Sequence, residues 1–187
     1  MALGFNGGTN VITGLATGGL PDGSVDTDSL ATSVNVFREV DQWRITSNLS
    51  TSNDWLDENW ERNDTNFSKI GTGVEVDTGA FSFPNTGIWL IQLNMVCYYS
   101  NNDRRYNGGQ IYATTNNSSY AEMANSYSYM GDASYAYAST HTQIVLDVTD
   151  VSNQKVKFKV EASGTVYFMG NSDYNRTCAT FIKLGAT

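Results

Sequence analysis

A regular alternation of apolar and polar residues constrains the fold of this chain more than any other feature. The longest run places six side chains on one face of a single strand: Trp89, Ile91, Leu93, Met95, Cys97 and Tyr99. Residues 155–162 alternate without a break and direct four side chains inward: Val156, Phe158, Val160 and Ala162. Half-buried segments of this kind, separated by turns rich in Gly, Asn, Ser and Asp, predict an antiparallel β-sandwich.

Further strands follow from the same pattern. We expect them over residues 37–46, 74–83, 110–115, 120–129, 144–148, 166–168 and 178–184. In the last of these, either the set containing Cys178 and Ile182 or the opposite set containing Phe181 points inward. The total is about eight to ten strands, the number that a jelly roll uses. No helical pattern exceeds two turns, so the predicted fold class is all-β: an antiparallel jelly-roll sandwich with an extended N-terminal arm.

Composition excludes several classes of function. Asp and Glu number 19 against 11 Lys and Arg, giving a net charge of −8. A nucleic-acid or anionic-membrane binder needs a basic face, so neither partner is expected. The chain has no run of about 18 apolar residues, so we expect no membrane insertion. Its opening residues lack the basic and continuous apolar regions of a secretory signal. With one histidine and two cysteines, we expect no cofactor, metal cluster or disulfide framework.

Residues 1–33 differ from the rest of the chain. They hold seven glycines, one aromatic residue and no Lys or Arg. We interpret this segment as an arm that docks on another surface, with a short helix possible over 25–31 behind Ser24. Its candidate anchoring residues are the apolar ones: Leu3, Phe5, Val11, Ile12, Leu15 and Leu20. Residues 34–187 form the predicted globular domain.

Candidate catalytic residues are few. His141 is the single histidine, and its polar surroundings favour an outward position on a strand over a place in a catalytic triad. The Gly-x-Ser-x-Gly motif of a nucleophile elbow is absent. Cys97 and Cys178 lie in apolar strands, which favours buried thiols. We therefore expect no catalytic residue and no enzyme activity.

An acidic stretch gives a weak metal hypothesis. Asp54, Asp57 and Glu58, followed by Glu61 and Asp64, could supply oxygen ligands to calcium. Their spacing does not match an EF-hand, so an exposed acidic loop is favoured over a metal site. The tryptophans within the stretch, Trp55 and Trp60, indicate that part of it packs against the sandwich or a neighbour.

Tyrosine is concentrated in the middle of the chain, with nine of the eleven between residues 98 and 137. Tyr interleaved with Ser, Gly and Asn is typical of binding loops, and Tyr is also common at buried subunit interfaces. The alternative is that Tyr is simply a good strand residue. The resulting candidates for ligand or subunit contact are Tyr106, Tyr112, Tyr120, Tyr127, Tyr129, Tyr135 and Tyr137, with Arg104 and Arg105.

Residues 81–91 resemble the signature of the tumour-necrosis-factor and complement globular-head jelly rolls. Phe81, Pro84, Gly87 and Trp89 occupy its aromatic, proline, glycine and aromatic places, and Phe181 matches the closing strand. That strand departs from the family in having Cys178 where an aromatic is usual and Thr180 where Gly is usual. The resemblance implies a ten-stranded jelly roll that assembles as a tight homotrimer, in a family of ligands and adhesive heads rather than enzymes.

A second resemblance concerns the arm. Residues 3–15 and 18–26, with the short motifs at 41–45 and 70–74, resemble structural proteins of tailed phages of marine bacteria. This resemblance implies a virion component that is assembled in the host cytoplasm. We therefore expect a homotrimer that is anchored to tail or capsid proteins and contacts a host surface glycan or receptor, as a tail fibre or adhesin.

Three other functions stay open at this stage. A capsid decoration protein would clamp neighbouring shell subunits and would need no host ligand. A soluble lectin-like or cytokine-like trimer would have no connection to a virus. A glycan-cleaving enzyme could use carboxylates such as Asp54, Asp57 or Glu58, because glycosidases place two carboxyl groups on either side of the bond.

Overall fold

The computed structural model describes residues 4–6, 11–13, 37–99, 104–131 and 135–187. The chain divides into two compact units, residues 1–36 and residues 37–187. In the first unit, β1 (Gly4–Asn6) pairs antiparallel with β2 (Val11–Thr13). The expected helix over 25–31 and the anchoring candidates Leu3, Leu15 and Leu20 lie outside the described residues.

The described residues of the second unit form strands and no helix, so the predicted all-β class is confirmed. Its twelve strands are joined by antiparallel pairings into one hydrogen-bonded system. They are β3 (Val40–Ile45), β4 (Leu49–Trp55), β5 (Trp60–Arg62), β6 (Lys69–Ile70), β7 (Glu75–Asp77), β8 (Ala80–Ser82), β9 (Gly87–Tyr99), β10 (Arg104–Thr114), β11 (Ala121–Met130), β12 (Ala136–Val148), β13 (Lys155–Phe168) and β14 (Cys178–Gly185). Within the described part of the chain there is no helix that is long and apolar enough to cross a membrane.

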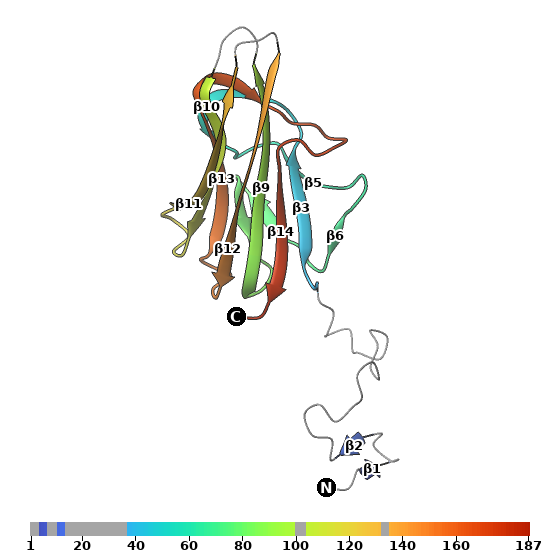
Figure 1. Cartoon of the computed structure of the whole chain (residues 1–187). Coiled ribbons are helices and arrows are strands. Elements are labelled where there is room, and N and C mark those ends of the chain that lie inside the picture. Colours follow the sequence, from blue (N-terminus) through green and yellow to red (C-terminus); the bar gives the residue numbers. More distant parts are fainter. Residues whose placement is uncertain (1–3, 7–10, 14–36, 100–103, 132–134) are drawn as a thin grey trace. The chain divides into compact units, whose positions relative to one another are not determined.

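The strands form two layers (Figure 1). The first sheet runs β12–β9–β14–β3, with β5 and β6 paired to β3 at its far edge. The second sheet runs β11–β10–β13, with β4 and β8 both paired to β13. At one end the layers join directly, because Tyr167 and Phe168 of β13 pair with Tyr98 and Cys97 of β9. The result is an antiparallel jelly-roll sandwich that approaches a barrel at that end.

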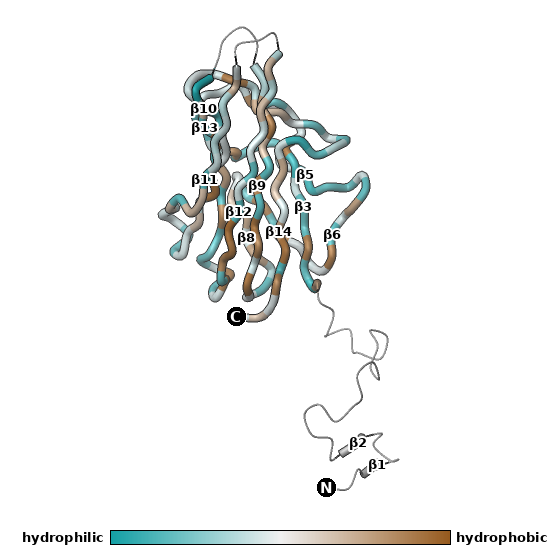
Figure 2. Tube along the Cα trace, viewed as in Figure 1, coloured by the Kyte–Doolittle hydropathy of each residue, from teal (hydrophilic) through white to brown (hydrophobic). Residues whose placement is uncertain are grey.

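Aromatic side chains fill the space between the layers. Phe81 is fully buried, and its ring centroid lies 5.0 Å from that of Phe181 and 5.4 Å from that of Phe158. Trp89 is also fully buried and packs 5.1 Å from Phe83. The inward faces predicted for residues 89–97 and 156–162 are confirmed by their burial. Figure 2 shows apolar residues concentrated along these long central strands.

Gly87, the glycine of the family signature, is required at its position for steric reasons. Gly87 has φ of +147°, which side-chain-bearing residues rarely adopt. A Cβ at this position would overlap the Lys183 side chain and lie 2.5 Å from the carbonyl oxygen of Gly185.

A tight hairpin turn joins β7 to β8. Thr78 and Gly79 both have positive φ between the paired residues Asp77 and Ala80. This is the two-residue type of turn that matches the twist of the flanking strands.

Several strand boundaries differ from the prediction. The strand expected at 110–115 begins at Arg104, and that expected at 144–148 begins at Ala136. The segments expected at 155–162 and 166–168 are one strand with a register shift after Glu161. In β14 the face containing Phe181 is the buried one, while Leu184 is exposed. The first three differences arise where polar or small residues are paired by neighbouring strands, which local alternation does not report.

Candidate functional site

The outward face of the first sheet is mostly uncharged. We call it the Tyr98 face and define it by the outward residues of β9, β12 and β14, with Tyr167 beside them. Its apolar and aromatic members are Ile88, Leu90, Val96, Tyr98, Tyr137, Val145, Tyr167, Ile182 and Leu184. Val145 pairs opposite Leu90 and is 62% exposed, and Tyr137 pairs opposite Tyr98 and is 63% exposed.

Three tyrosines lie together at the end of this face where β9 ends and β12 begins. The Tyr98 ring stacks on Tyr167 with centroids 5.0 Å apart and planes at 15°, and lies 5.8 Å from Tyr137. Polar but uncharged residues separate this group from the aliphatic end of the face, and Gln92 donates a hydrogen bond to Gln143 at 3.1 Å. Among the described outward positions of β9, β12 and β14, Asp147 is the one carboxylate and no position is Lys or Arg. His141 occupies an exposed position on β12, as predicted.

The outward face of the second sheet is aromatic and charged. We call it the Trp55 face and define it by the outward residues of β4, β13, β10 and β11. Trp55 packs against Tyr112 with centroids 4.8 Å apart, and Tyr106 packs against Tyr127 at 5.5 Å, both edge to face. The pairs of rings therefore bridge the strands in the same way that cross-strand pairs stabilise a sheet.

A carboxylate lies between the two pairs of rings. Glu161 accepts hydrogen bonds from the hydroxyl groups of Tyr127 at 2.9 Å and Tyr106 at 3.4 Å, and from Gln110 Nε2 at 3.0 Å. The amide of Gln110 also donates to the Tyr127 hydroxyl at 2.8 Å. These contacts hold the aromatic rings in one arrangement over the sheet.

Other charged groups surround this centre. Glu122 accepts from the Tyr112 hydroxyl at 3.2 Å and from Asn125 at 2.6 Å. The ammonium groups of Lys157 and Lys159 lie 5.0 Å and 5.8 Å from the centre of the Trp55 ring, within cation–π range. The Trp55 face thus presents rings, hydrogen-bond donors and acceptors side by side.

The phenol groups of Tyr112, Tyr120 and Tyr127 stay protonated at neutral pH. Burial, followed by the hydrogen bond to Glu161, raises the pKa of Tyr127 to about 12. Burial raises the pKa of Tyr112, and the Glu122 carboxylate adds to the effect. Burial raises the pKa of Tyr120 as well, with Asp57 as the second cause. A protonated phenol keeps its ability to donate a hydrogen bond.

A glycine on β10 makes this arrangement possible. A Cβ at Gly108 would overlap the backbone carbonyl oxygen of Ser126 and lie 2.6 Å from the Tyr127 ring. The missing side chain lets that ring lie across β10 and reach both Gln110 and Glu161. In the sequence, Gly108 and Gly109 resemble a turn between tyrosines, whereas the structure places them inside a strand.

The structure separates the tyrosine candidates rather than gathering them into loops. Tyr106, Tyr112 and Tyr127 lie on strands of the Trp55 face, whereas Tyr137 lies on the Tyr98 face. Tyr129 is exposed on β11, and Tyr135 is exposed with φ of 60° just before β12. As expected from the strands over 110–115 and 120–129, Tyr112, Tyr127 and Tyr129 lie in strands, which agrees with the alternative that Tyr serves here as a strand residue. The contact of these tyrosines with a ligand or a neighbouring subunit stays a prediction.

The remaining candidates, Tyr120, Arg104 and Arg105, lie at the starts of β11 and β10. Tyr120 directly precedes β11, and the Lys157 ammonium group is 5.9 Å from the centre of its ring. The Arg104 guanidinium lies 3.9 Å over the Tyr99 ring, and it donates to the Thr165 carbonyl oxygen. Arg105 is exposed at the start of β10, where its backbone nitrogen donates to Ser163.

Sequence reasoning missed several residues of both faces. The alternating run 155–162 indicates which residues point inward and gives no role to its polar half, which contains Lys159 and Glu161. The strand pattern likewise gives no separate role to Val145 or Tyr167. These residues share an outward strand position, and the role of such a position can be assigned only when the neighbouring strands are known.

The acidic stretch is partly exposed, as expected, and partly paired with cations of the fold. Asp54, Glu58 and Asp64 are exposed, whereas Asp57 and Glu61 are half-buried. Arg44, which is 1% exposed, pairs with Glu61 at 2.9 Å and with Asp64 at 2.7 Å. Asp57 pairs with Lys157 at 2.7 Å. These three ion pairs connect the stretch to β3 and β13.

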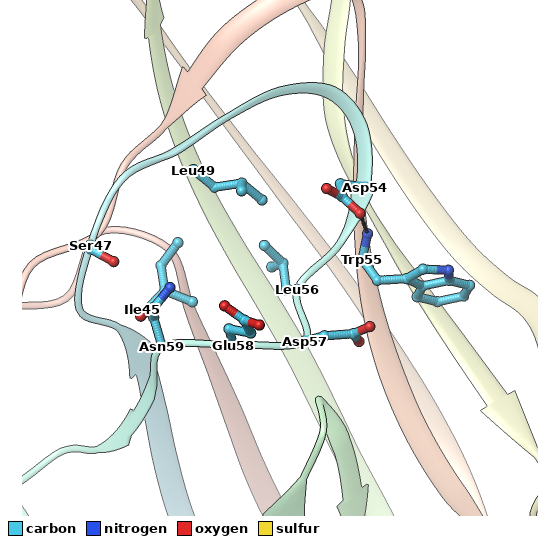
Figure 3. A pocket seen from close by; sticks show the side chains of 9 residues that line it. All are labelled: Ile45, Ser47, Leu49, Asp54, Trp55, Leu56, Asp57, Glu58 and Asn59. Carbon is cyan, nitrogen blue, oxygen red and sulfur yellow. Dashed lines mark hydrogen bonds between the residues drawn. The ribbon is translucent and has the colours of Figure 1, made fainter.

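A pocket of about 320 Å³ lies beside this stretch (Figure 3). Its lining comprises Ile45, Ser47, Leu49, Asp54, Trp55, Leu56, Asp57, Glu58 and Asn59. Figure 3 shows the side chains of Trp55 and Asp57 pointing away from Leu49 and Ile45 on the other side of the pocket. The described residues contain no group of three or more His, Cys, Asp or Glu side chains that could hold a metal ion.

The two cysteines are buried free thiols. Burial raises the pKa of Cys97 to about 12 and that of Cys178 to about 11. The Cys97 thiol donates to Asn107 Oδ1 at 2.9 Å. Because the thiolate is the reactive form, both side chains are chemically inert packing groups.

Two short motifs that suggested a phage protein contact each other in the fold. Asp41 of the first motif is fully buried and accepts a hydrogen bond from the backbone nitrogen of Val74, which ends the second motif. Asp41 also accepts from Trp43 Nε1 at 3.1 Å and pairs with Arg62 at 3.2 Å. Burial nevertheless raises the pKa of Asp41, against the lowering effect of these donors. Through its hydrogen bond with Val74, this buried carboxylate links the 71–74 loop to β3 of the first sheet.

Comparisons with known proteins bear on the fold. No protein-family model matches the chain, and no curated protein matches it. Among solved structures, that of murine APRIL at pH 5.0 is 15% identical, with a TM-score of 0.57, covering 78% of this chain and 98% of its own. Eiger TNF from S. frugiperda is 12% identical, with a TM-score of 0.53, covering 79% of this chain and 93% of its own. The chain therefore has a jelly-roll fold of the tumour-necrosis-factor type.

Proposed function

We propose that this protein is a homotrimeric, non-enzymatic attachment head whose subunits associate through the Tyr98 face. The observation that carries the proposal is the composition of that face, in which exposed apolar and aromatic side chains cover three long strands with a single carboxylate. Contiguous apolar surface of this kind marks protein interaction sites. The family resemblance of residues 81–91 implies the three-fold arrangement.

The distribution of charge supports burial of this face rather than the other. Burying an unpaired charge is costly, and interface centres are accordingly depleted of charged residues. The Tyr98 face meets that condition along β9, β12 and β14, where Val145 and Tyr137 are the most exposed of its large side chains. In a cyclic trimer each subunit would contact the next through two different patches of this surface.

The molar mass of the full chain in solution tests the trimer. We expect light scattering to give three times the chain mass for the natural protein. Val145→Glu would place three carboxylates in the proposed interface, so we expect it to give monomers. Met123→Glu is the matched control, because Met123 is 51% exposed on β11 of the other sheet. A monomeric natural protein, or a Val145→Glu variant that is still trimeric, would overturn the proposed assembly.

We further propose that the trimer is a component of a tailed-phage virion. The N-terminal arm would bind tail or capsid proteins, and the jelly roll would project as a tail fibre or adhesin. The support is the resemblance of residues 3–15 and 18–26 to phage structural proteins. Particles would be labelled with a gold-tagged antibody to residues 34–187 and examined by electron microscopy. Label at the tail tips supports the adhesin, label over the head indicates capsid decoration, and unlabelled particles overturn the virion assignment.

The absence of catalysis is also part of the proposal. The Asp57 carboxylate is paired with Lys157 at 2.7 Å and turned away from the pocket interior, which does not suit a glycosidase nucleophile. We expect no release of reducing sugar from host polysaccharide. Release that disappears in Asp57→Asn would show that the glycosidase alternative is correct.

A further inference from the structure

We propose that the Trp55 face binds a neutral glycan chain, with Trp55, Tyr112 and Tyr127 packing against sugar rings. This inference rests on the proposed attachment function and names the chemical class of its ligand. The carboxylate and ammonium groups among the rings would exchange hydrogen bonds with sugar hydroxyls.

The rings are held in place before any ligand arrives. Tyr127 and Tyr106 donate to Glu161, Tyr112 donates to Glu122, and the Trp55 ring is packed against Tyr112. Binding therefore orders few additional side chains, so little side-chain conformational entropy is lost when a ligand binds. Tyr and Trp also provide large contact area with few rotatable bonds.

A polyhydroxylated ligand fits this face better than a protein does. Glu122, Glu161 and Lys159 lie among the rings, and a dry protein interface would have to remove all three from water. A sugar hydroxyl both donates and accepts, so it can bridge a carboxylate and an ammonium group without separating them. Apart from Met123, the exposed large apolar side chains of the described second sheet are tyrosines.

The balance of charge favours a neutral glycan. The ammonium groups of Lys155, Lys157 and Lys159 are matched by the carboxylates of Asp57, Glu122 and Glu161, so the face has no excess positive charge to attract sulfate or sialic acid. The carboxylates are already engaged, since Glu161 accepts three hydrogen bonds and Glu122 accepts two. They leave no unpaired acid for a cationic ligand.

An unsatisfied acceptor lies at the centre of the face. Gln110 is 4% exposed, and its Oε1 atom accepts no hydrogen bond from the described residues. The Nε2 atom of the same amide is 2.8 Å from the hydroxyl of Tyr127, which is 43% exposed. A ligand hydroxyl that reached Oε1 would satisfy a buried acceptor, which is favourable.

The dimensions suit an extended chain rather than a single sugar. The face spans four neighbouring strands, β4, β13, β10 and β11, shown in part in Figure 1. At about 4.8 Å per strand, the distance across it is about 14 Å. A run of several sugar rings could therefore contact both the Trp55–Tyr112 pair and the Tyr106–Tyr127 pair.

The test uses the full chain on an array of neutral, sulfated and sialylated oligosaccharides, followed by calorimetry with the best neutral binder. We expect binding to neutral members, weakened at least tenfold by Tyr127→Ala and by Trp55→Ala, since truncated aromatic anchors typically have effects of this size. Tyr127→Phe keeps the ring and should retain most of the affinity. Tyr129→Ala is the control, because Tyr129 is 63% exposed on the same strand and belongs to neither ring pair.

The outcomes separate this inference from the proposed assembly. Each variant is checked for folding by circular dichroism, and Glu161→Gln serves in place of any that fails to fold. A trimer that binds no glycan, or binds with affinity unchanged by Tyr127→Ala and Glu161→Gln, would overturn the glycan site and leave the trimer standing. A monomer that binds neutral glycan through these residues would overturn the trimer alone. Binding restricted to sulfated or sialylated members would refute the neutral class.

Discussion

The two outward faces of the sandwich carry similar numbers of tyrosines but organise them differently. On the Tyr98 face the rings contact each other, with Tyr98 stacked on Tyr167 at 5.0 Å. On the Trp55 face the hydroxyl groups are held by carboxylates, as with Tyr127 and Glu161 at 2.9 Å. Charge, rather than aromatic content, distinguishes a surface suited to dry burial from one suited to a hydrated ligand.

The difference can be followed strand by strand. The outward residues of β13 are mostly charged: Lys155, Lys157, Lys159 and Glu161. The outward residues of β9 are uncharged: Ile88, Leu90, Gln92, Asn94, Val96 and Tyr98. Both strands direct a continuous apolar row into the same core. One core therefore supports two surfaces of different chemistry, and a change to either surface can be made without a change to the interior.

The largest effect should come from the core that the two faces share. Phe81→Ala removes a fully buried ring that packs against Phe158 of one sheet and Phe181 of the other. We expect a loss of about 3–5 kcal/mol in the free energy of unfolding, measured by urea denaturation. Phe37→Ala is the matched control, because Phe37 is 53% exposed. In Phe81→Ala, self-association and glycan binding should both be lost across the unfolding transition; loss of one without the other in this variant would contradict a shared core.

A smaller effect should separate the faces. Gly108→Ala introduces a methyl group where the Ser126 carbonyl and the Tyr127 ring leave no room. Overpacking of this kind costs about 1–3 kcal/mol, and it should displace Tyr127 and weaken glycan binding while the trimer persists. Gly185→Ala is the matched control, since nothing lies within 4 Å of a Cβ there. Intact glycan binding in Gly108→Ala would show that the position of the Tyr127 ring is unimportant.

The core of both sheets could be predicted from the sequence because alternation is a local property. The inward positions of Val156, Phe158 and Val160 follow from their neighbours in the chain, and so does the burial of Trp89. The signature residues Phe81 and Phe181 could be assigned to the core by resemblance. These positions depend on the strand period and on apolar burial, which act over a few residues.

The division of the tyrosines between two faces could not be predicted in this way. Tyr127 and Tyr137 are ten residues apart, yet the strands that hold them belong to different sheets. A register shift between Ile111 and Tyr112 further changes which residues of β10 and β11 face each other. The partners of Arg44, which lie 17–21 residues away, depend in the same way on the pairing of β3 with β5.

A single ring on the Tyr98 face should have a measurable effect on assembly. Tyr137 is 63% exposed in the subunit, so Tyr137→Ala should leave the stability of the subunit nearly unchanged. Loss of one aromatic contact should weaken self-association roughly fivefold to tenfold per subunit, measured by sedimentation over a concentration series. Tyr129→Ala, with equal exposure on the other sheet, should have no effect. Equal weakening by both variants would remove the distinction between the faces.

The smallest effect concerns the protonation of the Trp55 face. The pKa of Tyr127 is raised to about 12, above the ordinary value near 10, mainly by burial and then by Glu161. A group whose pKa is higher in the folded state contributes stability below its unfolded pKa and loses that contribution as the pH rises. Wild-type stability should therefore fall more between pH 10 and pH 12 than that of Tyr127→Phe, as measured by thermal unfolding. Parallel curves for the two proteins would mean that the fold does not raise the pKa of Tyr127, so that its hydroxyl is neither buried nor held by Glu161 in solution, and the preorganisation of this face would then rest on ring packing alone.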